Sequence, residues 1–188
     1  MAEVVSTNQF KNGMAIEIDG ESFTIVESQH VKPGKGGAFV RTRVRNIASG
    51  AVLDKTFRAG EKFNRIHTSS RTMTYLYSTD DEVVLMDPGS YEQVSLPPAM
   101  AAAALEWVVE NHEVLLLSLN GQPFAVEAPN HVELAIARTE PGLRGDTAQG
   151  GTKPAELETG VTIQVPLFIE SGDRVRVDTR NGQYITRV

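Results

Sequence analysis

The chain contains no cysteine among its 188 residues. This absence excludes disulfide bonds, thiolate metal sites and cysteine nucleophiles together. A chain without cysteine is typical of a reducing compartment, so we expect a cytoplasmic protein.

Long apolar runs are also lacking. No stretch approaches the roughly 20 apolar residues that a helix needs to cross a bilayer. The first residues, Met1-Ala2-Glu3-Val4-Val5, do not have the basic and apolar regions of a signal peptide. We therefore expect no contact with a membrane. The hydrophobic fraction of 40% is nevertheless that of a folded protein.

The groupings of residues that mark most enzymes are missing as well. The sequence has no G-x-S-x-G nucleophile motif and no dinucleotide-binding motif. Asp80-Asp81-Glu82 has the composition of a metal site, but a polar turn is the simpler interpretation. The histidines are scattered singly, without metal-ligand spacing, at His30, His67, His112 and His131. We expect a protein that is not an enzyme and that holds no metal or cofactor.

Negative charge prevails overall, at −6, but it is unevenly distributed. With provisional boundaries at 64 and 128, residues 1–64 carry +2, residues 65–128 carry −7 and residues 129–188 carry −1. Net charge governs solubility and long-range steering. It therefore does not exclude a local contact with RNA, and the mildly basic first third is the best place for one.

Short alternating segments separated by turn signals run through the chain. Asp19-Gly20 and Asn120-Gly121 are strong signals for two-residue hairpin turns. Pro166 interrupts the apolar segment Val161–Ile169, which places that strand at a sheet edge or a bulge. Ala99–Glu110 is the one segment with a helical pattern.

Strands every eight to twelve residues with a single helix indicate an all-β fold. We expect three small β-barrel domains, at residues 1–64, 65–128 and 129–188. Each is close to the lower size limit for an independent hydrophobic core, so packing between neighbouring domains should add stability.

An isolated lysine, Lys35, lies in a turn between the alternating segments Ser22–Ser28 and Phe39–Asn46. Proline and glycine make the turn, because they set or permit the backbone angles that a hairpin tip needs. The tip residues around Lys35 are Lys32, Pro33, Gly34, Gly36 and Gly37. A lysine flanked by glycines extends into solvent, which suits a phosphate backbone or a modifying enzyme. The alternative is an ordinary glycine-rich turn with a solubilising lysine.

Three arginines follow the tip at alternate positions. The two-residue period of a strand places Arg41, Arg43 and Arg45 on one face and Val40 and Val44 on the other. Such a stripe of cations could follow the phosphates of an RNA. A solvated outer face of a small barrel accounts for the pattern equally well.

A glycine-rich loop spans residues 140–153 in the last third. Its central residues, Arg144, Gly145, Asp146 and Thr147, are candidates for RNA contacts. A flexible connection between barrel strands is the alternative.

Several motifs together resemble those of bacterial translation elongation factor P, over essentially the whole chain. The sequence departs from the family at Ser90, where threonine is more usual. The motifs that carry the resemblance are, in chain order, VKPGKGGA at 31–38, KTF at 55–57, YLY at 75–77, MDPGSYEQ at 86–93, PGLRGDT at 141–147, KPA at 153–155 and VPLF at 165–168.

The resemblance implies a KOW-like barrel followed by two OB-fold barrels, arranged in an L shape similar to tRNA. It also implies a monomeric factor that binds both ribosomal subunits between the peptidyl and exit sites and relieves stalling at consecutive prolines. The Lys35 tip would point at the end of peptidyl-tRNA and could be extended by a lysine-modifying enzyme. Gly145-Asp146-Thr147 would lie near the exit-site codon.

Three alternatives stay open at this stage. An elongation-factor-P-like paralogue would share the fold, although the sequence PGKG of the tip favours the main family. A general single-stranded RNA-binding protein built from OB folds would need aromatic stacking platforms, and only 6% of the residues are aromatic. An enzyme with a glycine-rich loop is the least favoured, because no catalytic grouping accompanies the loop.

Overall fold

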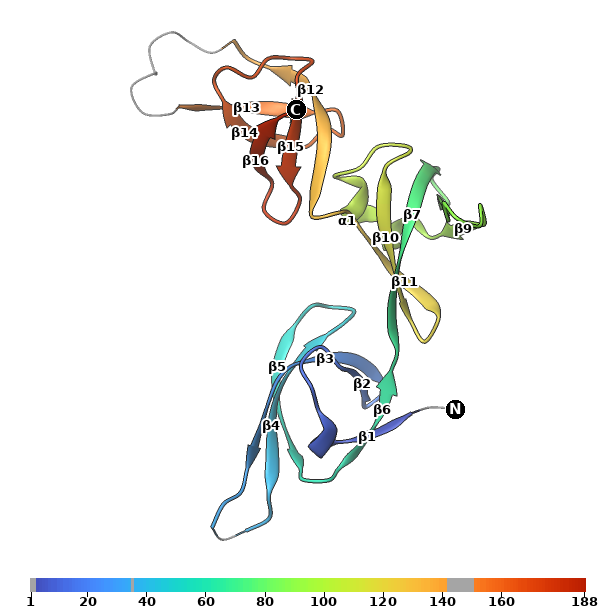
Figure 1. Ribbon diagram of the computed structural model, residues 1–188, viewed down its shortest axis with the longest axis vertical. Coiled ribbons are helices and arrows are strands. Elements are labelled where there is room, and N and C mark those ends of the chain that lie inside the picture. Colours follow the sequence, from blue (N-terminus) through green and yellow to red (C-terminus); the bar gives the residue numbers. More distant parts are fainter. Residues whose placement is uncertain (1–2, 35, 142–150) are drawn as a thin grey trace. The chain divides into compact units, whose positions relative to one another are not determined.

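The computed structural model describes residues 3–34, 36–141 and 151–188 (Figure 1). Nearly all of its regular structure is β-strand, which confirms the all-β prediction. The chain divides into two compact units, Met1–Ser69 with Leu119–Gln122 and Ser70–Ser118 with Pro123–Val188. None of the described helices is long and apolar enough to cross a membrane.

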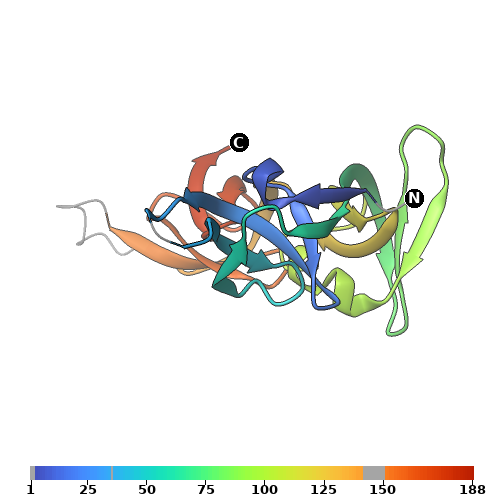
Figure 2. The same ribbon diagram turned by 90° about the horizontal axis from the view of Figure 1, so that it is seen from below.

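The first unit holds a six-stranded sheet with the order β1-β6-β2-β3-β4-β5, and the sheet is strongly curved (Figures 1 and 2). Its elements are β1 (Val4–Ser6), the 3-10 helix η1 (Thr7–Gln9), β2 (Ala15–Ile18), β3 (Glu21–Val31), β4 (Phe39–Asn46), β5 (Val52–Arg58) and β6 (Lys62–Ile66). The β2–β3 turn is the expected two-residue turn, since Asp19 and Gly20 both have positive φ, at 54° and 83°.

An aromatic cluster lies at the centre of this unit. The rings of Phe10, Phe57 and Phe63 have centroids 4.7 to 6.1 Å apart, in tilted or edge-to-face arrangements. Ile16 and Ile25, both fully buried, belong to the same core. Ile25 of β3, Val44 of β4 and Phe57 of β5 therefore share one core with this cluster.

The second unit holds two five-stranded sheets. The order of the first is β11-β10-β7-β8-β9 and that of the second is β14-β13-β12-β15-β16. The first contains β7 (Thr68–Ser78), β8 (Val83–Met86), β9 (Gln93–Leu96), β10 (Glu113–Leu119) and β11 (Gln122–Glu127), with η2 (Pro98–Met100) and α1 (Ala102–Leu105) after β9. The second contains β12 (His131–Thr139), β13 (Thr152–Leu157), β14 (Thr162–Pro166), β15 (Arg174–Asp178) and β16 (Gln183–Arg187).

These two sheets share one hydrophobic core. Buried residues of the first sheet, among them Met73 and Leu116, belong to the same cluster as Leu134 and Val175 of the second. The expectation that packing between neighbours adds stability therefore holds for the last two thirds of the chain. The domain boundaries at 64 and 128 stay a prediction.

The turn between β15 and β16 packs against Trp107, in the connection between α1 and β10. A Cβ atom built at Gly182 would lie 3.3 Å from the ring of Trp107, which is tighter than ordinary van der Waals contact. The hydroxyl of Thr179 in the same turn donates to the carbonyl of Pro129 at 2.7 Å. Glycine is therefore required at position 182 both by this close approach and by its φ of +68°.

The long helix expected over Ala99–Glu110 is wrong. Only the four residues of α1 are α-helical, after the 3-10 turn η2, and the amide of Trp107 already bonds to the carbonyl of Ala104, three residues back. Neither Pro97 nor Ala101, the residues at the two N-caps, offers a capping side chain. A short uncapped segment cannot offset the cost of helix nucleation, so the helix does not extend to Val108, which is buried in the core without being helical.

Two other local predictions are confirmed. Asn120 and Gly121 have φ of 49° and 82°, as a two-residue hairpin turn between β10 and β11 requires. Pro166 ends β14, which is an edge strand of its sheet. A proline there removes no hydrogen bond from the interior of the sheet.

Asp178, a buried carboxylate at the end of β15, organises the β15–β16 turn. It accepts hydrogen bonds from the guanidinium group and the backbone amide of Arg180. The side-chain bond from Arg180 is the main cause that lowers the pKa of Asp178 from 3.8 to about 2, and His131 beside it contributes in the same direction. Its carboxylate therefore stabilises the folded form in its ionised state.

The ion pair of Asp178 with Arg180 should make the stability of the folded protein sensitive to acid. Because the pKa of Asp178 is lower in the folded protein, its contribution to the free energy of unfolding is complete above about pH 4 and is lost as the pH falls through about 2. Asp178→Asn should lower stability at neutral pH and should flatten the fall in stability between those two pH values. Urea unfolding at a series of pH values measures both effects, and equal slopes for the two proteins would contradict the assignment.

Candidate functional site

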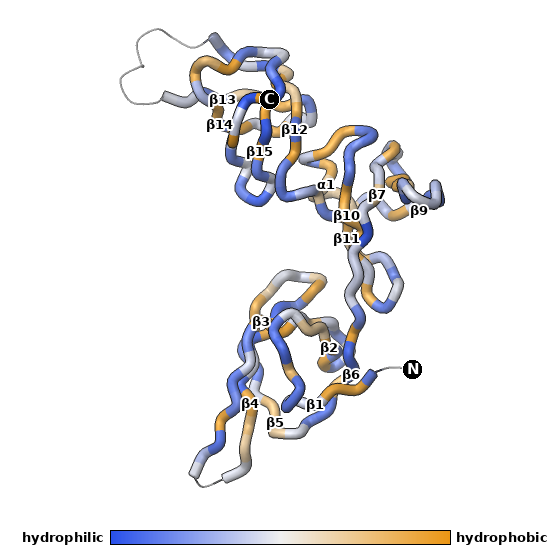
Figure 3. Tube along the Cα trace, viewed as in Figure 1, coloured by the Kyte–Doolittle hydropathy of each residue, from blue (hydrophilic) through white to orange (hydrophobic). Residues whose placement is uncertain are grey.

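The β3–β4 hairpin carries the tip that the sequence singles out. The strands pair from Phe23 opposite Asn46 to Val31 opposite Phe39, with a bulge between Ile25 and Glu27. Hydrophilic and hydrophobic stretches alternate along the hairpin (Figure 3). β3 continues three residues beyond the segment that the sequence predicted, so the hairpin extends to the tip as paired strands.

The tip residues on either side of Lys35 are exposed. Lys32, Pro33, Gly34, Gly36 and Gly37 all lie at the surface, whereas Lys35 itself is outside the described residues. Of the three glycines, Gly36 has a positive φ, at +115°, while Cβ atoms at Gly34 and Gly37 would meet nothing within 4 Å. The turn therefore depends on glycine most strongly at position 36.

The arginine stripe lies on one face of β4, as the two-residue period predicts. Arg41, Arg43 and Arg45 are exposed, whereas Val40 and Val44 are fully buried. This confirms the predicted face. Whether the three side chains contact RNA stays a prediction.

Acidic neighbours divide the stripe unevenly. The Nε of Arg43 bonds to Oδ1 of Asp54 on β5 at 3.1 Å, and Glu27 lies opposite Arg43 on β3. Arg41 instead lies between Gln29 and Thr56, which are uncharged. All of these residues line a groove of about 460 Å³ on the outer face of the hairpin.

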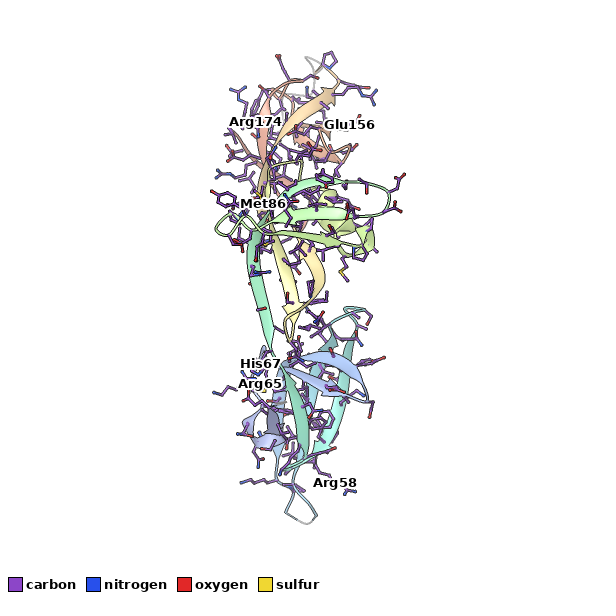
Figure 4. The ribbon with its side chains drawn as sticks, turned by 90° about the vertical axis from the view of Figure 1, so that its right-hand side faces the viewer. Arg58, Arg65, His67, Met86, Glu156 and Arg174 are labelled. Atoms are coloured by element: carbon purple, nitrogen blue, oxygen red, sulfur yellow. The ribbon has the colours of Figure 1, made fainter. Side chains whose placement is uncertain are left out.

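Sequence reasoning missed Arg58, at the end of β5. It pairs with Phe39 and so lies on the same face as the arginine stripe, next to the tip (Figure 4). The sequence does indicate the exposed face of β5, because the exposed residues Asp54, Thr56 and Arg58 occupy alternate positions and Phe57 between them is buried. What the sequence could not supply was the register that brings Arg58 beside Phe39.

The second group of candidate residues, Arg144, Gly145, Asp146 and Thr147, lies outside the described residues. The two strands that flank the loop are joined at its base. The ammonium of Lys153, which is buried, donates to the carbonyl of Glu140 at 2.7 Å, and the hydroxyl of Thr139 donates to the carbonyl of Pro154 at 2.9 Å. The sequence indicates Lys153 only as part of a motif, whereas in the structure its side chain joins the start of β13 to the residue that follows β12.

No group of three His, Asp or Glu side chains within residues 3–34, 36–141 and 151–188 could hold a metal ion. The expectation that the protein needs neither metal nor cofactor stays a prediction, since nothing in the structure tests it.

Three family models match the chain from end to end. They are described as the elongation factor P KOW-like domain over residues 6–63, the elongation factor P OB domain over residues 68–126 and the elongation factor P C-terminal domain over residues 132–187. Elongation factor P of Moorella thermoacetica is 53% identical over 184 residues, which are 98% of this chain and all of that protein. The chain belongs to the elongation factor P family.

Other relatives in this family are similarly close. The elongation factors P of Natranaerobius thermophilus and Saccharopolyspora erythraea are 51% and 49% identical over 185 residues, 98% of each chain. Among solved structures, the eukaryotic translation initiation factor 5A from Methanococcus jannaschii matches with a TM-score of 0.50 and 26% identity, covering 66% of this chain and 96% of that one.

Family membership confirms the resemblance that the sequence motifs indicate. It also confirms the fold class, because the matched domains are described as KOW-like and OB. An elongation factor P is a translation factor and not an enzyme.

The tip geometry yields a test with a matched control. Gly36→Ala should destabilise the hairpin end by about 1–3 kcal/mol, because a residue with a Cβ is strained at this φ. Gly37→Ala should be neutral or slightly stabilising, since it meets open space and reduces the freedom of the unfolded chain. Hydrogen exchange of the amides next to the tip, from Val31 to Phe39, measures the difference. Equal protection in both variants would show that the strain at position 36 has no effect.

Proposed function

We propose that this protein binds both subunits of the ribosome as a monomer, between the peptidyl and exit sites, and stimulates peptide-bond formation at consecutive prolines. Membership of the elongation factor P family supports a ribosomal partner. The observation that carries the finer proposal is the β3–β4 hairpin, whose paired strands end in an exposed glycine-rich tip with Lys35 at its centre.

The physical basis of the proposal is orientation. Proline is a poor nucleophile in peptide transfer and its ring restricts φ, so a peptidyl-tRNA that must react with it is easily misaligned. A cationic arm that holds the tRNA end in a reactive position can lower the barrier without any chemical group of its own. A tenfold gain in rate requires only about 1.4 kcal/mol.

Two further contacts belong to the proposal. The loop that contains Gly145, Asp146 and Thr147 would contact RNA near the exit-site codon, with the carboxylate of Asp146 accepting from a base amino group or a 2′-hydroxyl. A lysine-modifying enzyme would extend Lys35 and so lengthen the arm. The joined base of the loop, at Lys153 and Glu140, supports a defined exit of the loop from the barrel.

A general single-stranded RNA-binding protein is less well supported. Such a protein needs clustered aromatic platforms next to a basic groove. The exposed aromatic residues of the described chain are Tyr77 and Tyr91 in the acidic middle third and Phe168 in the last third. None of them lies on the basic hairpin face.

Lys35→Ala tests the proposal, with Lys32→Ala as the matched control. Both variants lose one lysine from the same exposed tip, so neither should change thermal stability. Lys35→Ala should slow the synthesis of a Pro-Pro-Pro sequence in a reconstituted translation system, whereas Lys32→Ala should have a much smaller effect. Ribosome binding should persist in both. Normal synthesis through Pro-Pro-Pro with Lys35→Ala would refute the proposed function.

A further inference from the structure

The outer face of β3–β4–β5 is built of cross-strand rows that differ in charge. Their composition follows from the register of the three strands. From the tip downward, the rows are Val31–Phe39–Arg58, Gln29–Arg41–Thr56, Glu27–Arg43–Asp54 and Thr24–Arg45–Val52. The two rows next to the tip therefore each carry one cation and no acid, whereas the third row is net negative.

The third row does not offer a free cation. Arg43 is bonded to Asp54 and has Glu27 directly opposite on its other side. Residues opposite each other in a sheet lie about 5 Å apart, so both carboxylates reduce the positive potential at this guanidinium. An incoming phosphate would have to displace an existing partner here.

Arg41 and Arg58, by contrast, both lie next to Phe39, one on the same strand and one at the paired position of β5. The guanidinium carbon of Arg41 lies 5.7 Å from the centre of the Phe39 ring, a stacking arrangement that restricts its orientation. Arg58 lies opposite the same phenylalanine on the neighbouring strand. Two exposed arginines, one stacked on the ring and one at the paired position, are thus carried by neighbouring strands at the base of the tip.

The backbone that carries Arg58 is fixed on both sides. Its amide donates to the carboxylate of Glu61 at 2.9 Å, and its carbonyl accepts from the hydroxyl of Thr7, which is fully buried, at 3.1 Å. The bond from the amide of Arg58 holds the carboxylate of Glu61 at the backbone. Because the backbone at Arg58 is already ordered, less backbone entropy is lost when its side chain binds a ligand.

We propose that Arg41 and Arg58 form a phosphate clamp that grips an RNA backbone at the base of the hairpin and fixes the direction of the Lys35 tip. The proposal rests on the proposed function and adds two things to it. It assigns a role to Arg58, and it distinguishes Arg41 from Arg43, whose charge is neutralised by Glu27 and Asp54. Arginine suits this role because its planar group binds phosphate oxygens in pairs.

The test compares three single variants, Arg41→Gln, Arg58→Gln and Arg43→Gln. Each removes one charge from the same exposed face, so Arg43→Gln is the control for loss of charge alone. The affinity of each protein for bacterial 70S ribosomes is measured over a range of salt concentrations. One series uses ribosomes with an empty peptidyl site and the other uses ribosomes with peptidyl-tRNA, which separates ribosomal RNA from tRNA as the source of the phosphate.

Arg41→Gln and Arg58→Gln should each weaken binding about three- to tenfold. Each should also make the salt dependence less steep, reducing the magnitude of the slope of log affinity against log salt by about 0.7–0.9. Arg43→Gln should change neither quantity. Equal losses of affinity in all three variants would overturn the clamp. Weaker binding with an unchanged salt slope would also overturn it, because that result would indicate a partner other than RNA phosphate. If the clamp fails while Lys35→Ala still slows Pro-Pro-Pro synthesis, the proposed function stands without it.

Discussion

Strand β4, which lies between β3 and β5, is paired with both neighbours along its length. This double pairing fixes the two-residue alternation, so that valines face the aromatic core and arginines face solvent. It also fixes the register, which decides which residue of each neighbouring strand lies beside each arginine. The character of the candidate site follows from that register more than from the arginines themselves.

Much of this architecture could be predicted from local sequence. Asp19-Gly20 and Asn120-Gly121 specify their turns because few other residues tolerate the backbone angles involved. The alternation at 39–46 specifies a strand with one exposed face, and proline at 166 specifies an edge. These are short-range constraints, and each depends only on residues that are close together in the sequence.

Long-range relations could not be read in the same way. The pairing of Arg43 with Asp54 and the position of Arg58 beside Phe39 depend on how β5 aligns with β4, which no local pattern encodes. The alanine-rich segment has no capping side chain at its start, and Val108 near its end belongs to a core shared by two sheets, a long-range contact that helix propensity does not include. Turn composition identified the candidate tip and loop and the resemblance to the family implied their roles, but neither could reveal which cations of the stripe have acidic neighbours.

A chain without cysteine permits a direct measurement of where the tip lies on the ribosome. Gly37→Cys would introduce a unique thiol at a position with open space around it, and Ser49→Cys would place one in the turn at the other end of β4. Hydroxyl radicals generated by an iron chelate on Cys at position 37 should cleave the acceptor end of peptidyl-tRNA, whereas those from position 49 should not. Cleavage of that end from neither position, or equally from both, while the protein remains bound would contradict the proposal that the hairpin orients peptidyl-tRNA.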